Sequence, residues 1–343
     1  MASNGTKVKK QLVWVFDLNK CIGCQTCSVA CKVLWNEGEE GTDYMLWMTV
    51  NTQPGKGTPK DWETMGGGYK DGTLQKGKVP TDEEFGGGWN YNYDEVLKGG
   101  KGRAVHLQKI AGSKTWGPNW DEDEGGGVWP NPYYFYMPRL CNHCTDASCV
   151  ESCPSGALKK DPEFGLVLRD EEVCQGSQQC QAACPYKKVY FNKERGVSQH
   201  CIGCFPRLEK GVAPACVRQC PGRAAWVGFL EEGTVVDNMV NKWKIAVPLH
   251  PEFGTHPNVF YVPPLAPAPL NADLSANEKA DRIPPEYLES LFGKEVHQAL
   301  GNLKAELEKK RRGEASEAMD ALILYEWKDC LGEFTKDPAS LKW

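Results

Sequence analysis

A chain of 343 residues is long enough for one large domain or two ordinary ones with a buried core. Its 40 lysines and arginines against 45 aspartates and glutamates leave a net charge of -5, which offers no basic field for DNA or RNA. Sixteen cysteines would indicate disulfides in a small secreted protein, but at this length, with C-x2-C spacing, they indicate thiolates bound to iron.

No stretch approaches the roughly 18 apolar residues that a membrane span needs. The best N-terminal candidate, Leu12 to Phe16, is shorter than the apolar part of a secretory signal and runs directly into Asp17. We therefore predict a first strand there, no direct membrane span and no export signal in the chain.

The first cysteine group occupies the segment that we delimit as residues 1–40. It reads Cys21-x2-Cys24-x2-Cys27-x3-Cys31, the spacing of bacterial ferredoxins, although Lys32 replaces the usual proline. Three close cysteines of such a run hold one cluster, and the fourth crosses to a second one. Ser28 to Trp35 is expected to be a helix that carries Cys31 away from its own loop.

Residues 41–130 differ in composition, with three Gly-Gly-Gly triplets and six of the 12 tryptophans. A flexible linker is the alternative, but disordered linkers are poor in aromatic residues. We predict an ordered, loop-rich insertion that packs over the cluster core or docks a partner. The six tryptophans are Trp47, Trp62, Trp89, Trp116, Trp120 and Trp129.

Residues 131–230 contain the other three cysteine groups and form the expected ferredoxin-like core. The second and third groups are joined by a predicted hairpin, with strands at 157–158 and 166–168 around the turn 161–165. Further strands are predicted at 188–191, 197–200 and 224–230. The groups read Cys141-x2-Cys144-x4-Cys149-x3-Cys153, then Cys174-x5-Cys180-x3-Cys184, then Cys201-x2-Cys204-x11-Cys216-x3-Cys220.

The long gap in the fourth group, 205–215, is predicted to be a surface loop. Residues 231–343 contain no further ligand, and we expect them to contact a partner. The four prolines between Tyr261 and Leu270 indicate an extended arm. Leucines near helical spacing predict one amphipathic helix over 286–312. Cys330, which belongs to no group, is interpreted as an inert buried thiol.

The cysteines can be assigned to clusters from the spacing alone. In a two-cluster unit each loop gives three cysteines to one cluster and its fourth to the other. The hairpin-linked groups must pair, so the first and last groups pair by elimination. The predicted sets are Cys21, Cys24, Cys27 and Cys220 for cluster 1; Cys201, Cys204, Cys216 and Cys31 for cluster 2; Cys141, Cys144, Cys149 and Cys184 for cluster 3; Cys174, Cys180 and Cys153 for cluster 4.

Cluster 4 lacks a fourth thiol, because Ser177 stands at the position of the missing ligand. Serine ionises far less readily than cysteine, and soft thiolates are the ligands that these clusters select. We expect three 4Fe-4S clusters and one 3Fe-4S cluster; a 4Fe-4S cluster with Ser177 as ligand is the alternative. His143 and His200 lie beside ligands, where they either fill polar niches or donate hydrogen bonds to sulfur.

The fold class predicted is α+β, with tandem ferredoxin-like two-cluster units, the Gly/Trp-rich insertion and a C-terminal arm with helices. Together the motifs resemble the iron-sulfur beta subunits of the dimethyl sulfoxide reductase superfamily of molybdoenzymes, in the branch of the nitrate, perchlorate, chlorate and selenate reductases and the dimethyl sulfide and ethylbenzene dehydrogenases. The motifs that carry the resemblance are Cys21-Ile-Gly-Cys24-Gln-Thr-Cys27, Cys141-Asn-His-Cys144, Cys184-Pro-Tyr-Lys-Lys and Cys201-Ile-Gly-Cys204-Phe-Pro-Arg.

The resemblance implies a non-catalytic subunit that relays single electrons through its clusters. Cluster 1 would face a catalytic alpha subunit with a molybdenum bis-guanine-dinucleotide cofactor. The Ser177 cluster would face a haem b gamma subunit or a c-type cytochrome. It further implies a periplasmic location by co-export with the catalytic subunit, with the cytoplasmic face of the inner membrane as the alternative. Rival functions are a stand-alone enzyme that binds substrate at the Ser177 cluster, and clusters that serve only as folding staples.

Overall fold

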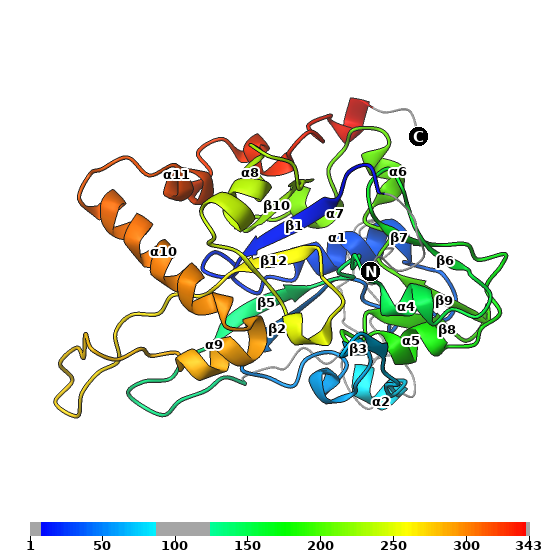
Figure 1. Cartoon of the computed structure of the whole chain (residues 1–343), viewed down its shortest axis with the longest axis horizontal. Helices are drawn as coiled ribbons and strands as arrows, with labels where there is room; N and C mark the ends of the chain where they lie inside the picture. The colour runs from blue at the N-terminus through cyan, green and yellow to red at the C-terminus, as the bar shows by residue number, and fades with distance from the viewer. Residues whose placement is uncertain (1–7, 87–123, 341–343) are drawn as a thin grey trace, which may run out of the picture.

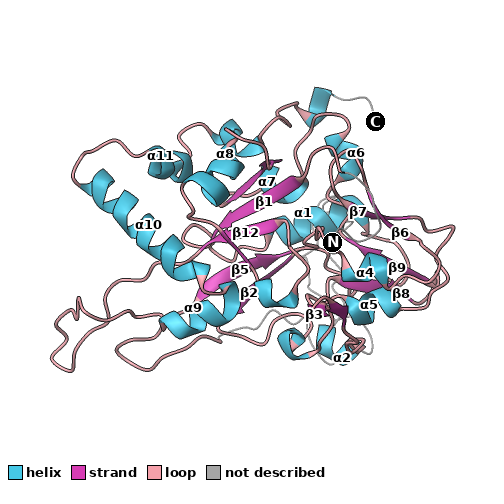
Figure 2. Ribbon diagram, viewed as in Figure 1, coloured by secondary structure: helices cyan, strands magenta, loops and turns pink. Residues whose placement is uncertain are grey.

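The computed structural model describes residues 8–86 and 124–340, and the chain in these ranges is a mixed α and β protein (Figures 1 and 2). At its centre lies a four-stranded sheet in the order β10-β1-β12-β11. Strand β1 pairs antiparallel with β10 and parallel with β12. The bounds are β1 Leu12–Asp17, β10 Ala225–Phe229, β12 Val259–Val262 and β11 Val247–Pro248.

Strand β1 is central because every one of its side chains is buried. Its sequence Leu-Val-Trp-Val-Phe is a continuous apolar run of β-formers, the pattern of a strand covered on both faces. The first strand predicted from the sequence is thus confirmed, and it delivers the chain directly to Cys21.

Within the described ranges four two-stranded ribbons accompany the sheet, and two of them lie at the end of the molecule opposite α10 (Figure 1). The predicted hairpin between the second and third cysteine groups is present as β6 and β7, and the next predicted pair as β8 and β9. The ribbons are β2 Thr49–Gln53 with β5 Phe135–Arg139, β3 Tyr69–Lys70 with β4 Thr73–Leu74, β6 Leu158–Lys160 with β7 Val167–Arg169, and β8 Val189–Asn192 with β9 Val197–His200.

Each of the four cysteine groups leads into a helix. The helix of the first group, α1, has 10 residues, and those of the other groups are about one turn long. Helix α1 packs against α7, and α4 packs against α5. In the described ranges no helix combines the length and apolar character needed to cross a membrane. The helices are α1 Thr26–Trp35, α2 Asp82–Phe85, α4 Ser148–Glu151, α5 Gln179–Ala183, α6 Phe205–Leu208, α7 Ala215–Arg218, α8 Val235–Asp237, α9 Pro285–Phe292, α10 Glu295–Arg311 and α11 Glu317–Ile323.

The prediction of one helix over 286–312 is wrong, because the segment forms two helices, α9 and α10. The break falls at Gly293, whose φ of 72° is open to glycine but strained for other residues. A side chain at Gly293 would also meet the ring of Pro251, 2.7 Å from the position of a Cβ. The leucine spacing continues across the break and so concealed it.

The prediction of a surface loop at 205–215 is also wrong. The segment begins with helix α6 and then turns inward, so that Leu208, Val212 and Ala213 are all buried. The Ala213 N–H donates to the carbonyl of Phe334, and Arg207 Nε donates to the Ala213 carbonyl. The extra residues of the fourth cysteine group therefore join the C-terminal segment to the core.

The described part of the Gly/Trp-rich insertion is ordered and shares the main core. Trp47 and Trp62 are buried, and β2 pairs with β5 of the following segment. Trp129, by contrast, is 82% exposed. Trp89, Trp116 and Trp120 lie outside the described residues, and the boundaries proposed at 41, 131 and 231 stay predictions. The arm predicted at 261–270 begins as the last two residues of β12 and then runs without regular structure.

Candidate iron-sulfur sites

The four cysteine loops share one backbone feature. The residue two positions after the first cysteine is left-handed in each loop, with φ between 44° and 67°. It is glycine in three loops and histidine in one, since few other residues adopt this conformation. The turn aims main-chain N–H groups at sulfur, as Gly203 N–H does to Cys201 Sγ at 3.4 Å. The four left-handed residues are Gly23, His143, Gly176 and Gly203.

The cysteines predicted for cluster 1 lie together around one cavity, although Cys220 is about two hundred positions away in sequence. Cys27 lies on α1, and Cys220 follows α7, which packs against α1. Burial raises the pKa of Cys27 to about 12, and the thiolates of Cys21, Cys220 and Cys24 add to the shift. Cys24 is exposed, so this cavity opens at the surface.

The cysteines predicted for cluster 2 are all buried. Helix α1 carries Cys31 away from its loop, and burial, then the thiolates of Cys201 and Cys204, raise the Cys31 pKa well above its usual value. Burial likewise raises the pKa of Cys216, helped by Cys204, Cys201 and Cys31. Trp35, at the end of α1, donates its indole N–H to Cys204 Sγ at 3.2 Å.

The cysteines predicted for cluster 3 line a second cavity: Cys141, Cys144, Cys149 and Cys184. Burial raises the pKa of Cys144 to about 12. Burial also raises the pKa of Cys149 well above its usual value, and Cys184, Cys141 and Cys144 are the next causes.

The three cysteines predicted for cluster 4 also face one another. Burial raises the pKa of Cys180 to about 11, and Cys153 and Cys174 contribute to the rise, whereas a hydrogen bond with Ser198 opposes it. At Cys153, burial is outweighed by hydrogen bonds from the Leu158 N–H and its neighbours, so its pKa is lowered. Ser177 is exposed in the loop between Cys174 and Cys180.

None of the sixteen cysteines, which all lie in the described residues, forms a disulfide, and burial disfavours the ionised form of most of them. A set of buried thiolates needs a positive centre to be stable, and the iron of a cluster supplies one. The residues present therefore fit iron-sulfur clusters. Cys330 is buried as predicted, and its Sγ–H donates to the carbonyl of Trp327 at 2.9 Å.

The two histidines beside the ligands are each anchored through one nitrogen. His143 Nδ1 accepts from the Val167 N–H at 3.1 Å, which leaves a hydrogen on its Nε2. His200 Nδ1 donates to the Cys201 carbonyl at 2.7 Å, which leaves a lone pair on its Nε2. Both Nε2 atoms are buried and have no hydrogen-bond partner in the described residues. Burial lowers the His200 pKa to about 4 and also lowers that of His143, so both rings are neutral at pH 7.

The sequence reasoning missed a set of buried lysines around the cysteines. Lys160 donates to the carbonyls of His143 and Cys144 at 2.6 and 2.8 Å. Lys187 and Lys188, three and four residues after Cys184, are also buried. The only signal in the sequence was the dipeptide Lys187-Lys188 in the motif after Cys184. Two adjacent lysines normally indicate an exposed turn, so their burial was not predicted.

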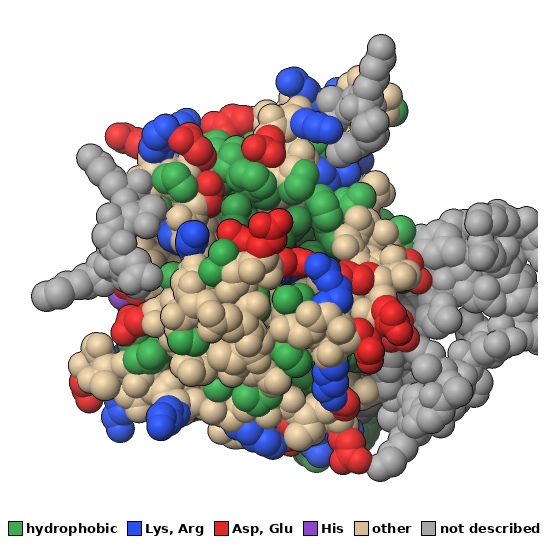
Figure 3. All heavy atoms as spheres, turned by 90° about the vertical axis from the view of Figure 1, so that its right-hand side faces the viewer, with side chains coloured by type: hydrophobic (Ala, Val, Ile, Leu, Met, Phe, Trp, Pro, Cys, Tyr) green, Lys and Arg blue, Asp and Glu red, His purple; other side chains and the backbone are tan. Residues whose placement is uncertain are grey.

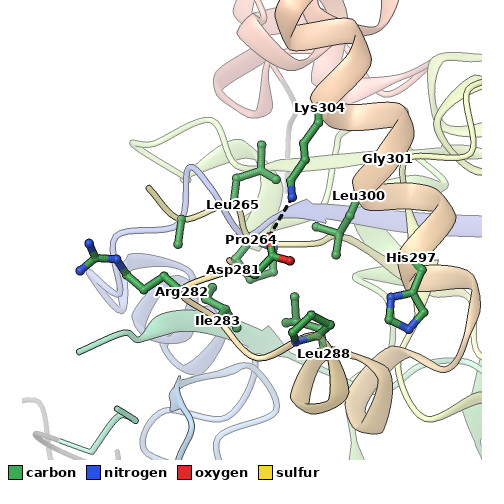
Figure 4. Close-up of a pocket in the computed structure, with 12 residues that line it drawn as sticks. Pro264, Leu265, Asp281, Arg282, Ile283, Leu288, His297, Leu300, Gly301 and Lys304 are labelled. Atoms are coloured by element: carbon green, nitrogen blue, oxygen red, sulfur yellow. Dashed lines mark hydrogen bonds and ion pairs between the residues drawn. The ribbon is translucent and has the colours of Figure 1, made fainter. Parts of the chain in front are cut away.

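The cavity drawn in Figure 4 lies between the extended arm and α10, and none of its lining residues is a cysteine. Its floor is apolar, with Leu265, Ile283 and Leu288. Its lysine and aspartate are already joined, since Lys304 Nζ lies 3.0 Å from Asp281 Oδ1. This cavity therefore contributes nothing to the redox site.

Comparison with known proteins agrees with the cysteine pattern. Residues 132–229 match the model of a 4Fe-4S dicluster domain. The selenate reductase subunit beta of Thauera selenatis is 50% identical over 329 residues, covering 94% of this chain and 99% of the relative. The chlorate reductase subunit beta of Ideonella dechloratans is 49% identical, with 94% and 99% coverage. The perchlorate reductase subunit beta of Dechloromonas aromatica is 50% identical, with 92% and 94% coverage.

Relatives of this similarity, which align over nearly their whole length, show the family to which the chain belongs. The dicluster match places iron-sulfur chemistry in the segment that holds three of its four cysteine groups. The chain thus belongs to the family of iron-sulfur beta subunits of the dimethyl sulfoxide reductase superfamily of molybdoenzymes, and it is an electron-transfer subunit rather than a catalytic one.

Proposed function

We propose that the chain relays electrons along a line of four clusters, three 4Fe-4S and one 3Fe-4S, held in tandem ferredoxin-like units. The clusters, when bound, supply reversible one-electron chemistry. The residues of the chain hold them in order, exclude water and set their potentials through hydrogen bonds and charge. The ligand sets are those predicted from the spacing, and the Ser177 set holds the 3Fe-4S cluster.

The observation that carries this proposal is the order in which the four sets neighbour and influence one another. Sets 1 and 2 meet on α1, which carries Cys27 and Cys31. Sets 2 and 3 meet where the Cys201 thiolate raises the pKa of Cys141. Sets 3 and 4 meet through the effect of Cys180 on the pKa of Cys149. Neighbouring sets therefore follow in the order 1-2-3-4, which supports electron transfer between two surfaces.

The two ends of this line reach the surface. At set 1, Cys24 is exposed and the neighbouring Ile22 is 64% exposed, an unusual value for a large apolar side chain. At set 4, Ser177 is exposed among hydrophilic glutamines. The face at that end of the molecule has a hydrophobic patch in its upper half, bordered by acidic side chains (Figure 3).

We assign the set 1 end to a catalytic alpha subunit that holds a molybdenum bis-guanine-dinucleotide cofactor, because the relatives are beta subunits of such reductases. We assign the set 4 end to a haem partner, either a haem b gamma subunit or a c-type cytochrome. We further propose a periplasmic location, reached by co-export with the catalytic subunit; the alternative is the cytoplasmic face of the inner membrane.

The complex would be an anaerobic respiratory oxyanion reductase or a sulfide or hydrocarbon dehydrogenase. Among the relatives, the dimethylsulfide dehydrogenase subunit beta of Rhodovulum sulfidophilum is 48% identical, so both directions of electron flow are represented. A nitrate reductase-type complex is a second candidate, since the respiratory nitrate reductase subunit beta of Haloferax mediterranei is also 48% identical over 92% of the chain. A stand-alone enzyme would instead need substrate at the Ser177 cluster.

Iron and sulfide analysis with low-temperature EPR of the oxidised protein tests the proposal. We expect about fifteen iron atoms per chain and an oxidised 3Fe-4S signal. Co-purification then identifies the partner subunits. Bound zinc, or fewer than three cluster signals on reduction, would exclude the relay. Reduction of a substrate by the isolated chain with an artificial donor would favour the stand-alone enzyme.

A further inference from the structure

Lys188 is a buried side chain that lies between two of the cysteine sets. Only 1% of it is exposed. It lines the cavity of Cys141, Cys144, Cys149 and Cys184, which is set 3. It also lies near set 2, because the adjacent Val189 pairs with His200, the residue before Cys201. In agreement, its charge lowers the pKa of both Cys31 and Cys201. One amino group thus faces both inner sets.

The hydrogen bonds of Lys188 match those of an ammonium group. Its Nζ lies 3.1 Å from the Leu46 carbonyl, 3.2 Å from Thr49 Oγ1 and 3.1 Å from the Tyr190 hydroxyl. The carbonyl can only accept. Tyr190 gives its own hydrogen to the Leu46 carbonyl, and Thr49 gives its hydrogen to the carbonyl of Arg139. All three partners therefore accept from Lys188, and three donated hydrogens need –NH3+, because a neutral amine has only two.

The three hydrogen-bond partners of this charge are neutral. Burial lowers the pKa of Lys188 well below its usual value, the guanidinium of Arg139 adds to this, and the thiolates of Cys201, Cys31 and Cys141 oppose it. In the described part of the chain, the groups that favour the charged form of Lys188 are thus the thiolates of the two cysteine sets.

We propose that Lys188 is a shared electrostatic positioning residue that raises the reduction potentials of clusters 2 and 3 together. Reduction adds negative charge to a cluster, and a fixed positive charge in a medium of low dielectric constant favours the reduced form. Because the same charge faces both sets, it stabilises the reduced forms of both clusters. Removal of the charge would lower both potentials and would change the difference between them much less. The inference rests on the proposed ligand sets.

The chain offers matched controls that each act on one set. Lys160 is a buried ammonium that faces set 3, through Cys144, Cys141 and Cys149. Trp35 donates a hydrogen bond to Cys204 of set 2. A Lys160→Met variant should lower only the cluster 3 potential, and a Trp35→Phe variant only that of cluster 2, so these variants also assign the EPR signals.

The test is EPR-monitored redox titration of the cluster-loaded protein as purified, with Lys188→Met and Lys188→Arg. In Lys188→Met we expect the equilibrium constant for reduction of each inner cluster to fall at least tenfold, which lowers its potential by 59 mV for one electron. Lys188→Arg, which keeps the charge, should restore most of the shift. Lys188→Gln, which keeps N–H donors but has no charge, is measured in parallel. The result then does not depend on whether a single neutral variant incorporates its clusters.

Two intact inner clusters with unchanged potentials in the neutral variants would overturn the inference, and so would a shift of one cluster alone. These outcomes differ from failure of the proposed function. If the wild-type protein lacks four clusters by iron, sulfide and EPR, the ligand sets themselves are wrong. If the wild type has four and the neutral variants leave both inner potentials in place, only the role of Lys188 is wrong.

Discussion

Ser177 lies at the place in its loop that Cys24 holds in the first loop. The residue before each is a left-handed glycine, with φ of 66° and 67°, and the residue after each is a left-handed glutamine, with φ of 55° and 59°. A helix begins two residues after each of them, and both side chains are exposed. The backbone around Ser177 is therefore that of a cluster loop, and the difference between the two sites is one atom, oxygen in place of sulfur.

This relationship predicts that Ser177→Cys converts the 3Fe-4S cluster into a 4Fe-4S cluster without a change in backbone. The iron content should rise from about fifteen to about sixteen atoms per chain, and the oxidised 3Fe-4S EPR signal should disappear. Ser177→Ala is the control and should leave both unchanged. Loss of iron or of a reduced 4Fe-4S signal in Ser177→Ala would instead show that the serine oxygen is a ligand.

The hydrogen bond from Trp35 to Cys204 predicts a change in one potential. Donation to a ligand sulfur withdraws electron density and favours the reduced cluster, so Trp35→Phe should lower the cluster 2 potential by an amount equivalent to about 1 kcal/mol. Redox titration followed by EPR measures it, and the remaining three potentials serve as internal controls. Equal shifts in all four would indicate a general loosening of the fold and contradict this role.

The features that could be predicted from the sequence are those determined by local spacing and periodicity. The apolar run of β1, the two hairpins and the loops around the cysteines follow from patterns of five to ten residues. Contacts between segments that are distant in the sequence leave no local pattern, so they could not be predicted. The parallel pairing of β1 with β12 and the pairing of β2 with β5 depend on tertiary packing.

Buried charge was the other part that the sequence could not predict. A lysine in a sequence is expected at the surface, and the acceptors that satisfy Lys188 come from Leu46, Thr49 and Tyr190, which are not adjacent to it. The break between α9 and α10 likewise depends on Pro251, which is some forty residues upstream of Gly293. Only the folded chain brings these groups together.

The left-handed glycine of the fourth loop predicts a sensitive position. Gly203 has φ of 63°, and a Cβ there would lie 2.7 Å from the side chain of buried Leu166. Gly203→Ala should cost about 1 kcal/mol for the backbone and about 1 to 3 kcal/mol for the clash. We expect a lower unfolding temperature and loss of iron from cluster 2.

Gly196→Ala is the matched control for this prediction, because Gly196 has φ of 69° and open space around its Cβ position. It should show the backbone cost without the clash and keep its full iron content. If the two variants unfolded at the same temperature, the contact with Leu166 would not contribute to the destabilisation by Gly203→Ala.

The ion pairs of His250 predict a pH-dependent contribution to stability away from the clusters. His250 is buried, with its Nδ1 2.7 Å from Glu252 Oε1 and its Nε2 3.4 Å from Glu63 Oε1. Burial alone would lower its pKa, but the two carboxylates outweigh burial and raise it above the usual value. A raised pKa means that folding favours the protonated ring. The stabilisation is therefore complete below the unfolded pKa of about 6.5 and is lost as the pH rises through the folded pKa.

His250→Gln should accordingly destabilise the protein by about 1 kcal/mol at pH 6 and much less at pH 9, a modest effect because Glu63 and Glu252 are 36% and 55% exposed. The measurement is the unfolding temperature of variant and wild type across this range. His297→Gln is the control, since His297 pairs with Glu289 at a half-exposed surface site. A difference between His250→Gln and wild type that stayed constant from pH 6 to pH 9 would mean that packing against Trp62 and Phe253, and not the charge, is what His250 contributes.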